Sequence, residues 1–235
     1  MMQETLNKQI IITTISLIAV ILLFNFTNLD MTIQHYFYDF ETKNWILSEK
    51  EPIANLIFYS GFKKLFISFS IILLIVLLFI NKISILKEYK KGLIILLLSM
   101  IFVSSLAILK NITNMPCPFN TIEFGGKYPE VKLFESYPQD NTPPKILKCY
   151  PAGHATMGFS LMALYFLFKT QKNKNLGLII GITTGILTGG YKMLIGDHFL
   201  SHTLVTMISA WLIILLIVKF ISYIQRQKFE KPTKV

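Results

Sequence analysis

Three small clusters of ionisable residues stand where apolar stretches of the chain begin or end. Lys110 ends one apolar run, Gly153-His154 begins another, and Lys192, His198 and His202 lie around the break between two more. Histidine can act as a nucleophile or as a general acid, and lysine stabilises developing negative charge. Ionisable groups at a membrane edge are costly, so their positions are functional hypotheses by default.

Each cluster also has an ordinary structural explanation when it is taken alone. Lys110 could extend its charged end towards water, Pro151-Ala152-Gly153 could simply start a helix, and a histidine could cap one. Together, however, the clusters hold three of the four histidines of the chain at one predicted membrane level. This convergence favours a functional site.

Transmembrane helices are the elements predicted to position these residues. Hydrophobic residues make up 53% of the 235, too many for a soluble domain that must cover itself with polar surface. A membrane helix needs about 20 mostly apolar residues. Six spans are predicted, at residues 10–26, 65–80, 93–109, 155–168, 176–195 and 204–223, and the fourth is short. The predicted fold is an all-α polytopic membrane helical bundle, a single integral membrane domain over residues 1–235.

The first span could instead be a cleaved signal peptide, because Lys8 precedes an apolar run near the N-terminus. The run is long, and residues 24–28 offer no pair of small residues for cleavage. A permanent membrane anchor is therefore favoured.

The charges orient the predicted spans. Lysines dominate residues 81–92, residues 169–175 and the tail after residue 218, whereas the segments at about 26–64 and 111–153 carry most of the acidic residues. By the positive-inside rule, the lysine-rich segments and both termini are cytoplasmic, and the other two are outer loops. The net charge of +10 thus needs no nucleic acid to explain it.

The two outer loops differ in composition. The second is rich in proline and glycine and is predicted to be an ordered, turn-rich cap. In the first, residues 31–40 and 53–59 are apolar with polar breaks, which predicts short helices at the membrane interface, with ordinary loop packing as the alternative. Cys117 and Cys149 both fall in the second loop, so they are candidates for a disulfide; two buried free thiols are the alternative.

In order and spacing, the three clusters resemble the motifs of the type 2 phosphatidic acid phosphatase superfamily. Those motifs are Lys-x6-Arg-Pro, Pro-Ser-Gly-His and Ser-Arg-x5-His-x3-Asp. Here they read Lys110-x6-Cys117-Pro118, Pro151-Ala152-Gly153-His154 and Lys192-x5-His198-x3-His202. The resemblance extends over spans three to six and implies a membrane phosphatase.

The resemblance also implies a role for each matching residue. His198 would attack phosphorus and form a phosphohistidine, and His154 would protonate the leaving oxygen as general acid. Lys110, Lys192 and the backbone amides around Gly153 would bind the phosphate. Uncatalysed hydrolysis of phosphate monoesters is among the slowest known reactions. A covalent intermediate divides the reaction into two easier steps.

The chain departs from the family motifs where they hold phosphate. Cys117 and Lys192 replace arginines, and Ala152 replaces a serine. The single arginine of the chain lies in the predicted cytoplasmic tail, so no bidentate guanidinium clamp is available. Lysine charges and amides are therefore expected to hold phosphate, and Lys145 or Lys148 could replace a missing charge.

A fourth departure affects the nucleophile. His202 stands where the family has an aspartate that orients the attacking imidazole. A neutral histidine can accept the same hydrogen bond, and residues four apart on a helix share a face. Asp197 is the alternative orienter. His198, His202 and Asp197 could also hold a transition metal, but the family motif explains the spacing without one, so no metal or other cofactor is expected.

The sequence thus predicts a lipid phosphatase that hydrolyses phosphoric monoesters, with a membrane lipid and the bilayer as its only expected partners. The long outer cap favours a bulky headgroup, so lipid A at the periplasmic face of a bacterial inner membrane is the first candidate. Undecaprenyl diphosphate, phosphatidic acid and phosphatidylglycerol phosphate are alternatives. A lipid phosphotransferase would use the same phosphohistidine. An inactive lipid-binding or channel protein is the non-enzyme alternative, but it would need neither His154 nor His198.

Overall fold

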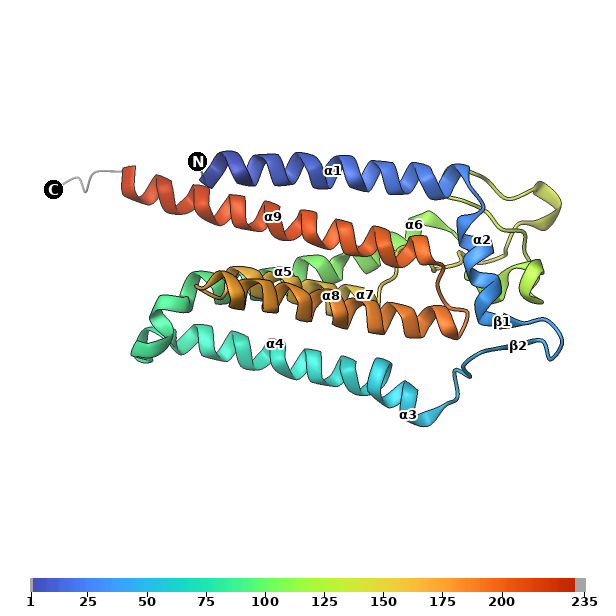
Figure 1. The fold of residues 1–235 in the computed structure, drawn as a ribbon, viewed down its shortest axis with the longest axis horizontal. Coiled ribbons are helices and arrows are strands. Elements are labelled where there is room, and N and C mark those ends of the chain that lie inside the picture. The colour runs from blue at the N-terminus through green and yellow to red at the C-terminus, as the bar shows by residue number, and fades with distance from the viewer. Residues whose placement is uncertain (1, 231–235) are drawn as a thin grey trace.

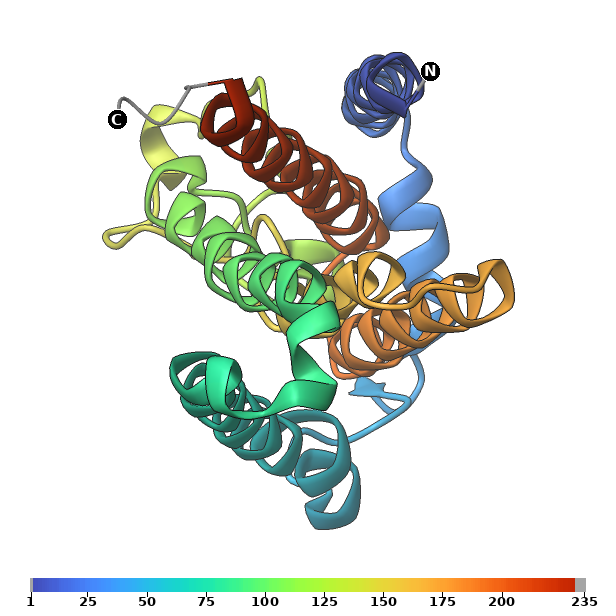
Figure 2. The same ribbon diagram turned by 90° about the vertical axis from the view of Figure 1, so that its left-hand side faces the viewer.

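Five long helices lie side by side in the computed structural model, which describes residues 2–230 (Figure 1). They are α1 (Met2–Phe26), α4 (Gly61–Phe79), α5 (Lys90–Ser104), α8 (Gln171–Leu194) and α9 (Leu200–Glu230). Figure 2 shows α1 beside α9 and far from α4, which lies on the other side of the bundle.

Shorter elements connect these helices. The short α-helices are α2 (Leu29–Gln34), α3 (Pro52–Asn55), α6 (Lys110–Thr113) and α7 (Ala155–Ser160). Strands β1 (Tyr38–Asp39) and β2 (Asn44–Trp45) pair antiparallel, with Tyr38 opposite Trp45. Turns of 3-10 helix lie at His35–Phe37, Ile80–Lys82, Ser84–Tyr89, Ser105–Leu109, Pro118–Asn120, Ile122–Phe124, Gln139–Asn141 and Leu161–Phe166, and a π-helical turn lies at Leu56–Ser60.

The membrane character predicted from the sequence is confirmed. Among the described residues, five helical stretches are long and apolar enough to cross a bilayer: Gln3–Phe26, Pro52–Lys82, Ser84–Asn120, Gln171–Leu194 and Leu200–Gln227. Their outer surfaces are apolar, as Ile12 (63% exposed) on α1 and Leu65 (71% exposed) on α4 illustrate. Helices suit this environment because their backbone polar groups are satisfied within the segment. The protein is an all-α polytopic membrane protein.

The fourth predicted span, at residues 155–168, forms the shorter apolar helix Ala155–Phe166. Its second half is 3-10 helix, which rises about 2 Å per residue instead of about 1.5 Å, so the segment reaches roughly 21 Å. This segment runs alongside α8. Its first residue, Ala155, lies near Gly189, and the ring of Tyr165, near its end, lies close to Lys174. Whether it completes a sixth crossing stays a prediction.

A stripe of glycines on α8 allows this close packing. Gly177, Gly181, Gly185 and Gly189 recur every four residues and therefore share one helix face. A Cβ atom at Gly181 would collide with the backbone of Met162, and one at Gly185 would collide with the ring of Phe159. Small residues let two helix backbones approach in this way within membranes.

Different elements lie at the two ends of the bundle. At one end the side chains of Gln3 and Arg226 meet at 3.3 Å, which places the start of α1 beside the last turns of α9. At the other end lie α2, the β1–β2 hairpin and the α8–α9 turn (Figure 1). The site residues described below belong to this second end. Its location on the outer side of a membrane stays a prediction.

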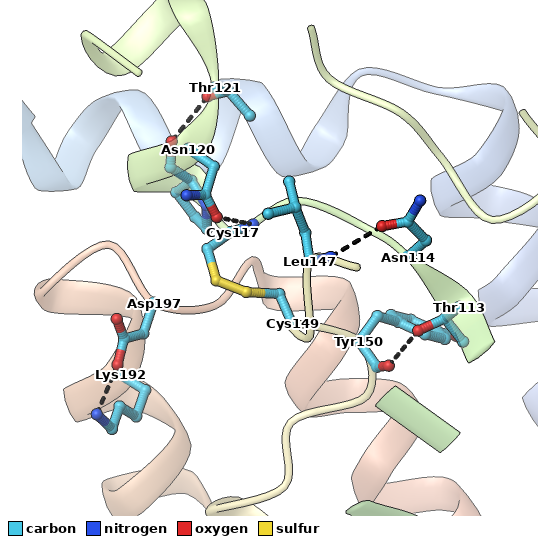
Figure 3. Close-up of a disulfide and its surroundings, with 11 residues drawn as sticks. Thr113, Asn114, Cys117, Asn120, Thr121, Leu147, Cys149, Tyr150, Lys192 and Asp197 are labelled. Atoms are coloured by element: carbon cyan, nitrogen blue, oxygen red, sulfur yellow. Dashed lines mark hydrogen bonds and ion pairs between the residues drawn. A yellow bond between two sulfur atoms is a disulfide. The ribbon is translucent and has the colours of Figure 1, made fainter. Parts of the chain in front are cut away.

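The segment between α6 and α7 is tied together at its base (Figure 3). Cys117 and Cys149 form a disulfide, with their Cα atoms 5.2 Å apart. The Thr113 hydroxyl donates to the Tyr150 carbonyl at 2.6 Å, and the Leu147 amide donates to Oδ1 of Asn114 at 2.8 Å. These links hold the end of α6 close to the chain that enters α7.

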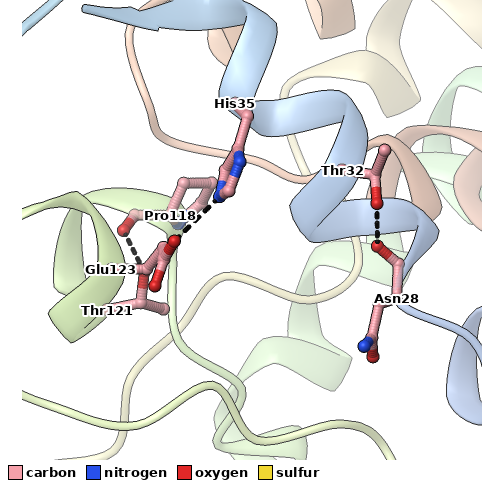
Figure 4. A network of polar contacts seen from close by, with 6 residues as sticks. All are labelled: Asn28, Thr32, His35, Pro118, Thr121 and Glu123. Carbon is pink, nitrogen blue, oxygen red and sulfur yellow. Dashed lines mark hydrogen bonds and ion pairs between the residues drawn. The ribbon is translucent and has the colours of Figure 1, made fainter. Parts of the chain in front are cut away.

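The segment between α1 and α4 packs onto the segment between α6 and α7 (Figure 4). Nε2 of His35 lies 3.0 Å from Oε1 of Glu123, and the Tyr38 and Trp45 rings pack against Phe124, with ring centroids 5.4 and 5.3 Å away. The predicted short helices at 31–40 and 53–59 are present in part. In the segment 31–40 the helical structure ends at Phe37, because Tyr38–Asp39 pairs as a strand. The segment 53–59 is helical throughout. Their position at a membrane interface stays a prediction.

Candidate active site

The α8–α9 turn carries His198, and its shape depends on Gly196. This glycine has φ = +79°, in the left-handed region where a side chain is strained, and the ring of Trp45 occupies the space that a Cβ would need. The turn then closes as the amides of Asp197 and His198 donate to the Lys192 carbonyl at 2.8 and 3.2 Å. The chain can therefore leave α8 and enter α9 within five residues, 195–199.

Three histidines from two segments meet beside this turn. The ring centroids of His154 and His198 lie 6.4 Å apart, and those of His198 and His202 lie 5.7 Å apart. His198 is 3% exposed and His202 is fully buried. The structure thus brings together the predicted nucleophile, general acid and orienter.

The predicted cations reach the same place. A Cβ at Gly153 would lie 2.9 Å from Cε and 3.2 Å from Nζ of Lys110, so the absent side chain leaves room for the Lys110 ammonium next to the Gly153 backbone. The Nζ atom of Lys192 lies 2.5 Å from Oδ2 of Asp197 (Figure 3). His154, His198, Gly153, Lys110 and Lys192 therefore lie close to one another.

Burial and cations keep the histidines neutral. Burial, followed by the charges of Lys192, Lys110 and Lys63, lowers the pKa of His154 to about 3. Burial likewise lowers the pKa of His198 well below its usual range, with Lys110 as the next cause. A neutral imidazole has a free lone pair, which a nucleophile requires. His154 in turn needs a proton before it can act as an acid.

The structure does not form the predicted hydrogen bond between the rings of His198 and His202. Neither ring nitrogen of His198 has a hydrogen-bond partner among the described residues, and the His202 ring meets it edge to face. Asp197, the alternative orienter, pairs with Lys192 instead. The role of His202 as orienter therefore stays a prediction.

The geometry does not support the alternative of a transition-metal site at His198, His202 and Asp197. Within residues 2–230, no group of three or more His, Cys, Asp or Glu side chains is placed to hold a metal ion. The carboxylate that such a site would need, that of Asp197, forms an ion pair with Lys192.

Whether Lys145 or Lys148 replaces a missing charge stays a prediction. Lys63 adds a third positive charge near His154, and its effect on the pKa of that histidine is smaller than the effects of Lys192 and Lys110. Residues 61–64 begin α4, beside the π-helical turn, so this lysine arrives from a part of the chain without any of the three motifs.

Tyr59, also unforeseen from the sequence, covers the cluster. Its ring centroid lies 4.7 Å from that of His154 and 4.3 Å from the Lys192 Nζ atom. The π-helical turn Leu56–Ser60 holds it there, and π-turns occur frequently at functional sites. No sequence signal marks this turn.

A polytopic bundle of apolar helices with a buried cluster of histidines and lysines at one end defines an integral membrane protein with a polar site at the ends of its helices. Residues 92–226 match the PAP2 superfamily and span more than half of the chain. The chain therefore belongs to the PAP2 superfamily, the type 2 phosphatidic acid phosphatases. Neither a curated protein nor a solved structure matches it. Superfamily members are phosphatases that act on phosphate esters, which supports a hydrolase.

Proposed function

We propose that the protein is a lipid phosphate phosphatase that acts through a phosphohistidine on His198. The observation that carries the proposal is the approach of the His154 and His198 rings, with centroids 6.4 Å apart. The Lys110 ammonium lies beside Gly153, and the Lys192 ammonium lies over the Tyr59 ring that packs against His154. A phosphoryl group between the rings would meet a nucleophile on one side, an acid on the other, and cations at its nonbridging oxygens.

The reaction would take place in two steps. A ring nitrogen of His198 attacks phosphorus, and the N–P bond forms as the bond to the leaving oxygen breaks. His154 takes up the proton that the bound monoester carries and gives it to that oxygen. Neutral His154 then accepts a proton from a water molecule whose oxygen attacks phosphorus, and the N–P bond breaks to release inorganic phosphate. Lys110 and Lys192 would stabilise the oxygens in both steps.

A lipid at the outer membrane face is the substrate class that we propose. The α8–α9 turn, which carries His198, lies at one end of the bundle (Figure 1), and a site at helix ends would meet lipid headgroups rather than acyl chains. The segment 111–153 over this end favours a bulky headgroup, and lipid A is our first candidate. The distribution of lysines supports the periplasmic face of a bacterial inner membrane.

Phosphate release by purified protein in mixed micelles tests the proposal. Lipid A, undecaprenyl diphosphate and phosphatidic acid are compared, with His198→Ala as the inactive control. Release that disappears in His198→Ala, with an acid-labile phosphoprotein in the wild type only, supports the phosphatase. Phosphoprotein without release identifies a transferase that needs a lipid acceptor. A folded protein that gives neither product contradicts the proposal.

A further inference from the structure

Helix α2 buries two polar side chains on one face. Asp30 is 7% exposed and Gln34 is fully buried. Residues four apart on a helix lie on the same side, so both face the bundle from one short element. Buried carboxylates and amides are costly unless they are hydrogen-bonded, so their partners explain their presence.

Asp30 bonds to the start of α9. Its Oδ1 atom accepts a hydrogen bond from the Ser201 amide at 2.8 Å, and the Ser201 hydroxyl faces the same carboxylate. Ser201 belongs to the first turn of α9, where backbone N–H groups have no partner within the helix. A carboxylate from elsewhere in the chain thus caps this helix and complements its positive end.

Gln34 bonds to the end of α8. Its Nε2 atom donates to the Met193 carbonyl at 2.9 Å, in the last turn of that helix. Carbonyls in this turn also lack partners within the helix. The two partners in each contact are far apart in sequence: Asp30 and Ser201 differ by 171 in residue number, and Gln34 and Met193 differ by 159.

Between these two attachment points lies the turn with His198. Two more backbone contacts support it: the Leu47 amide donates to the Leu194 carbonyl at 3.3 Å, and the Phe119 amide donates to the Gly196 carbonyl at 3.0 Å. The α2 contacts differ from these because they use side chains and fix both ends of the turn at once.

We propose that Asp30 and Gln34 are positioning residues that clamp the α8–α9 turn and so set the position of the His198 imidazole. The inference rests on the proposed role of His198. Neither residue touches the reacting atoms; both act through the backbone of the turn. Misplacement of a catalytic group by about 1 Å can cost roughly 100-fold in rate, so a clamp of this kind would be visible in kcat. Helix α2 lies outside residues 92–226, so the clamp joins the matched region to a segment that precedes it in the chain.

The test compares Asp30→Ala, Asp30→Asn and Gln34→Leu with the wild type. Thr32→Ala is the matched control, because Thr32 is exposed on the same helix and its hydroxyl donates to the Asn28 carbonyl of the same segment. We expect Asp30→Ala and Gln34→Leu to lower kcat by roughly 10- to 100-fold with little change in KM, since substrate binding remains. Asp30→Asn keeps an acceptor oxygen and should recover most of the loss. Thr32→Ala should equal the wild type.

Hydrogen exchange of the folded variants, read by mass spectrometry over residues 193–203, gives a second measurement that does not need activity. Faster exchange there in Asp30→Ala and Gln34→Leu, but not in Thr32→Ala, supports the clamp. Unchanged exchange overturns it. Faster exchange with an unchanged kcat overturns the positioning role. A wild type without phosphate release contradicts the proposed function, while the exchange result still decides whether the clamp exists.

Discussion

The Nζ atom of Lys192 lies 2.5 Å from Oδ2 of Asp197, so a cation proposed to bind phosphate already has an anionic partner. Both side chains are mostly buried, 5% and 22% exposed, which strengthens the pair relative to one in water. A phosphate at Lys192 must therefore share the ammonium with a carboxylate or displace it. The pair also holds Asp197 away from His198.

Replacement of Asp197 by asparagine should tighten phosphate binding. Without the carboxylate, the repulsion between two anions disappears and the charge of Lys192 is fully available. We expect inorganic phosphate to inhibit Asp197→Asn on the order of tenfold more strongly, a difference of about 1.4 kcal/mol. The inhibition constant against a lipid substrate measures this. Asp140→Asn, which removes an exposed carboxylate of the cap, is the control. Weaker inhibition of Asp197→Asn would mean instead that the carboxylate holds Lys192 in position.

The pH profile should show that the proton for the leaving group arrives with the substrate. The pKa of His154 is lowered to about 3, so its ring is neutral in the free protein at pH 7. A phosphate monoester loses its last proton with a pKa of about 6. We expect kcat/KM to be level between about pH 4 and 6 and to fall about tenfold per pH unit above that range.

An aryl phosphate with a lower second pKa serves as the control for this profile. The descending limb should move to lower pH with it, because the substrate proton is the one that matters. A profile that rises through pH 7 with either substrate would show that a group of the protein supplies the proton instead.

Asp30 should make the protein less stable as the pH rises through the weakly acidic range. Burial raises the pKa of Asp30 to about 6, against the hydrogen bonds from Ser201 and the charge of Lys132. The neighbouring Glu130 has a pKa raised to about 7, mainly by burial, and Tyr150 also faces the carboxyl group. A raised pKa means that the folded state binds the proton more tightly than the unfolded one. Its stabilisation is complete below about pH 4 and is lost as the pH rises to about 6.

The expected loss from Asp30 alone is about 3 kcal/mol in the free energy of unfolding. Thermal unfolding in detergent at pH values from 4 to 7 measures it for the wild type and Asp30→Asn. The asparagine variant should lose this part of the pH dependence and keep the part due to Glu130. Parallel curves for the two proteins would show that Asp30 does not titrate in this range.

The disulfide should stabilise the cap without taking part in chemistry. Cys117 and Cys149 are 32 residues apart, and closing a loop of that length is worth about 3 to 4 kcal/mol in the chain-entropy account. We expect Cys117→Ala with Cys149→Ala to unfold at a lower Tm and to keep the wild-type KM. Reduction of the wild type should lower Tm in the same way, with no further effect on the double variant. Thiol labelling of the native, unreduced protein would contradict the bond.

The residues predicted from the motifs converge because helix geometry fixes where motif residues lie. Lys110 begins α6, the last turn of one helical stretch, His154 directly precedes α7, and His198 lies two residues before α9. Helix ends that meet at one level of the bundle therefore bring these residues together. The apolar stretches predicted five of the spans for the same reason: length and composition alone decide whether a helix can cross a bilayer.

The residues that the sequence did not reveal act at long range. Asp30 and Gln34 reach α9 and α8 across more than 150 residues, and Tyr59 depends on a π-turn with no local pattern. Only tertiary packing defines such contacts. The glycine stripe of α8 is different, because its spacing of four can be read in the sequence, although none of the predictions above uses it. Such spacing is typical of close helix contacts in membranes.

That stripe fixes the height of His154 in discrete steps. Gly158 on α7 faces Gly185 on α8 so closely that a Cβ on the first would overlap the backbone of the second. The short helix could fit α8 again only after a shift by a full repeat of four residues, about 6 Å along the axis. The contact between Gly158 and Gly185 therefore opposes a gradual shift of α7 along α8, and it keeps His154 at the height of His198.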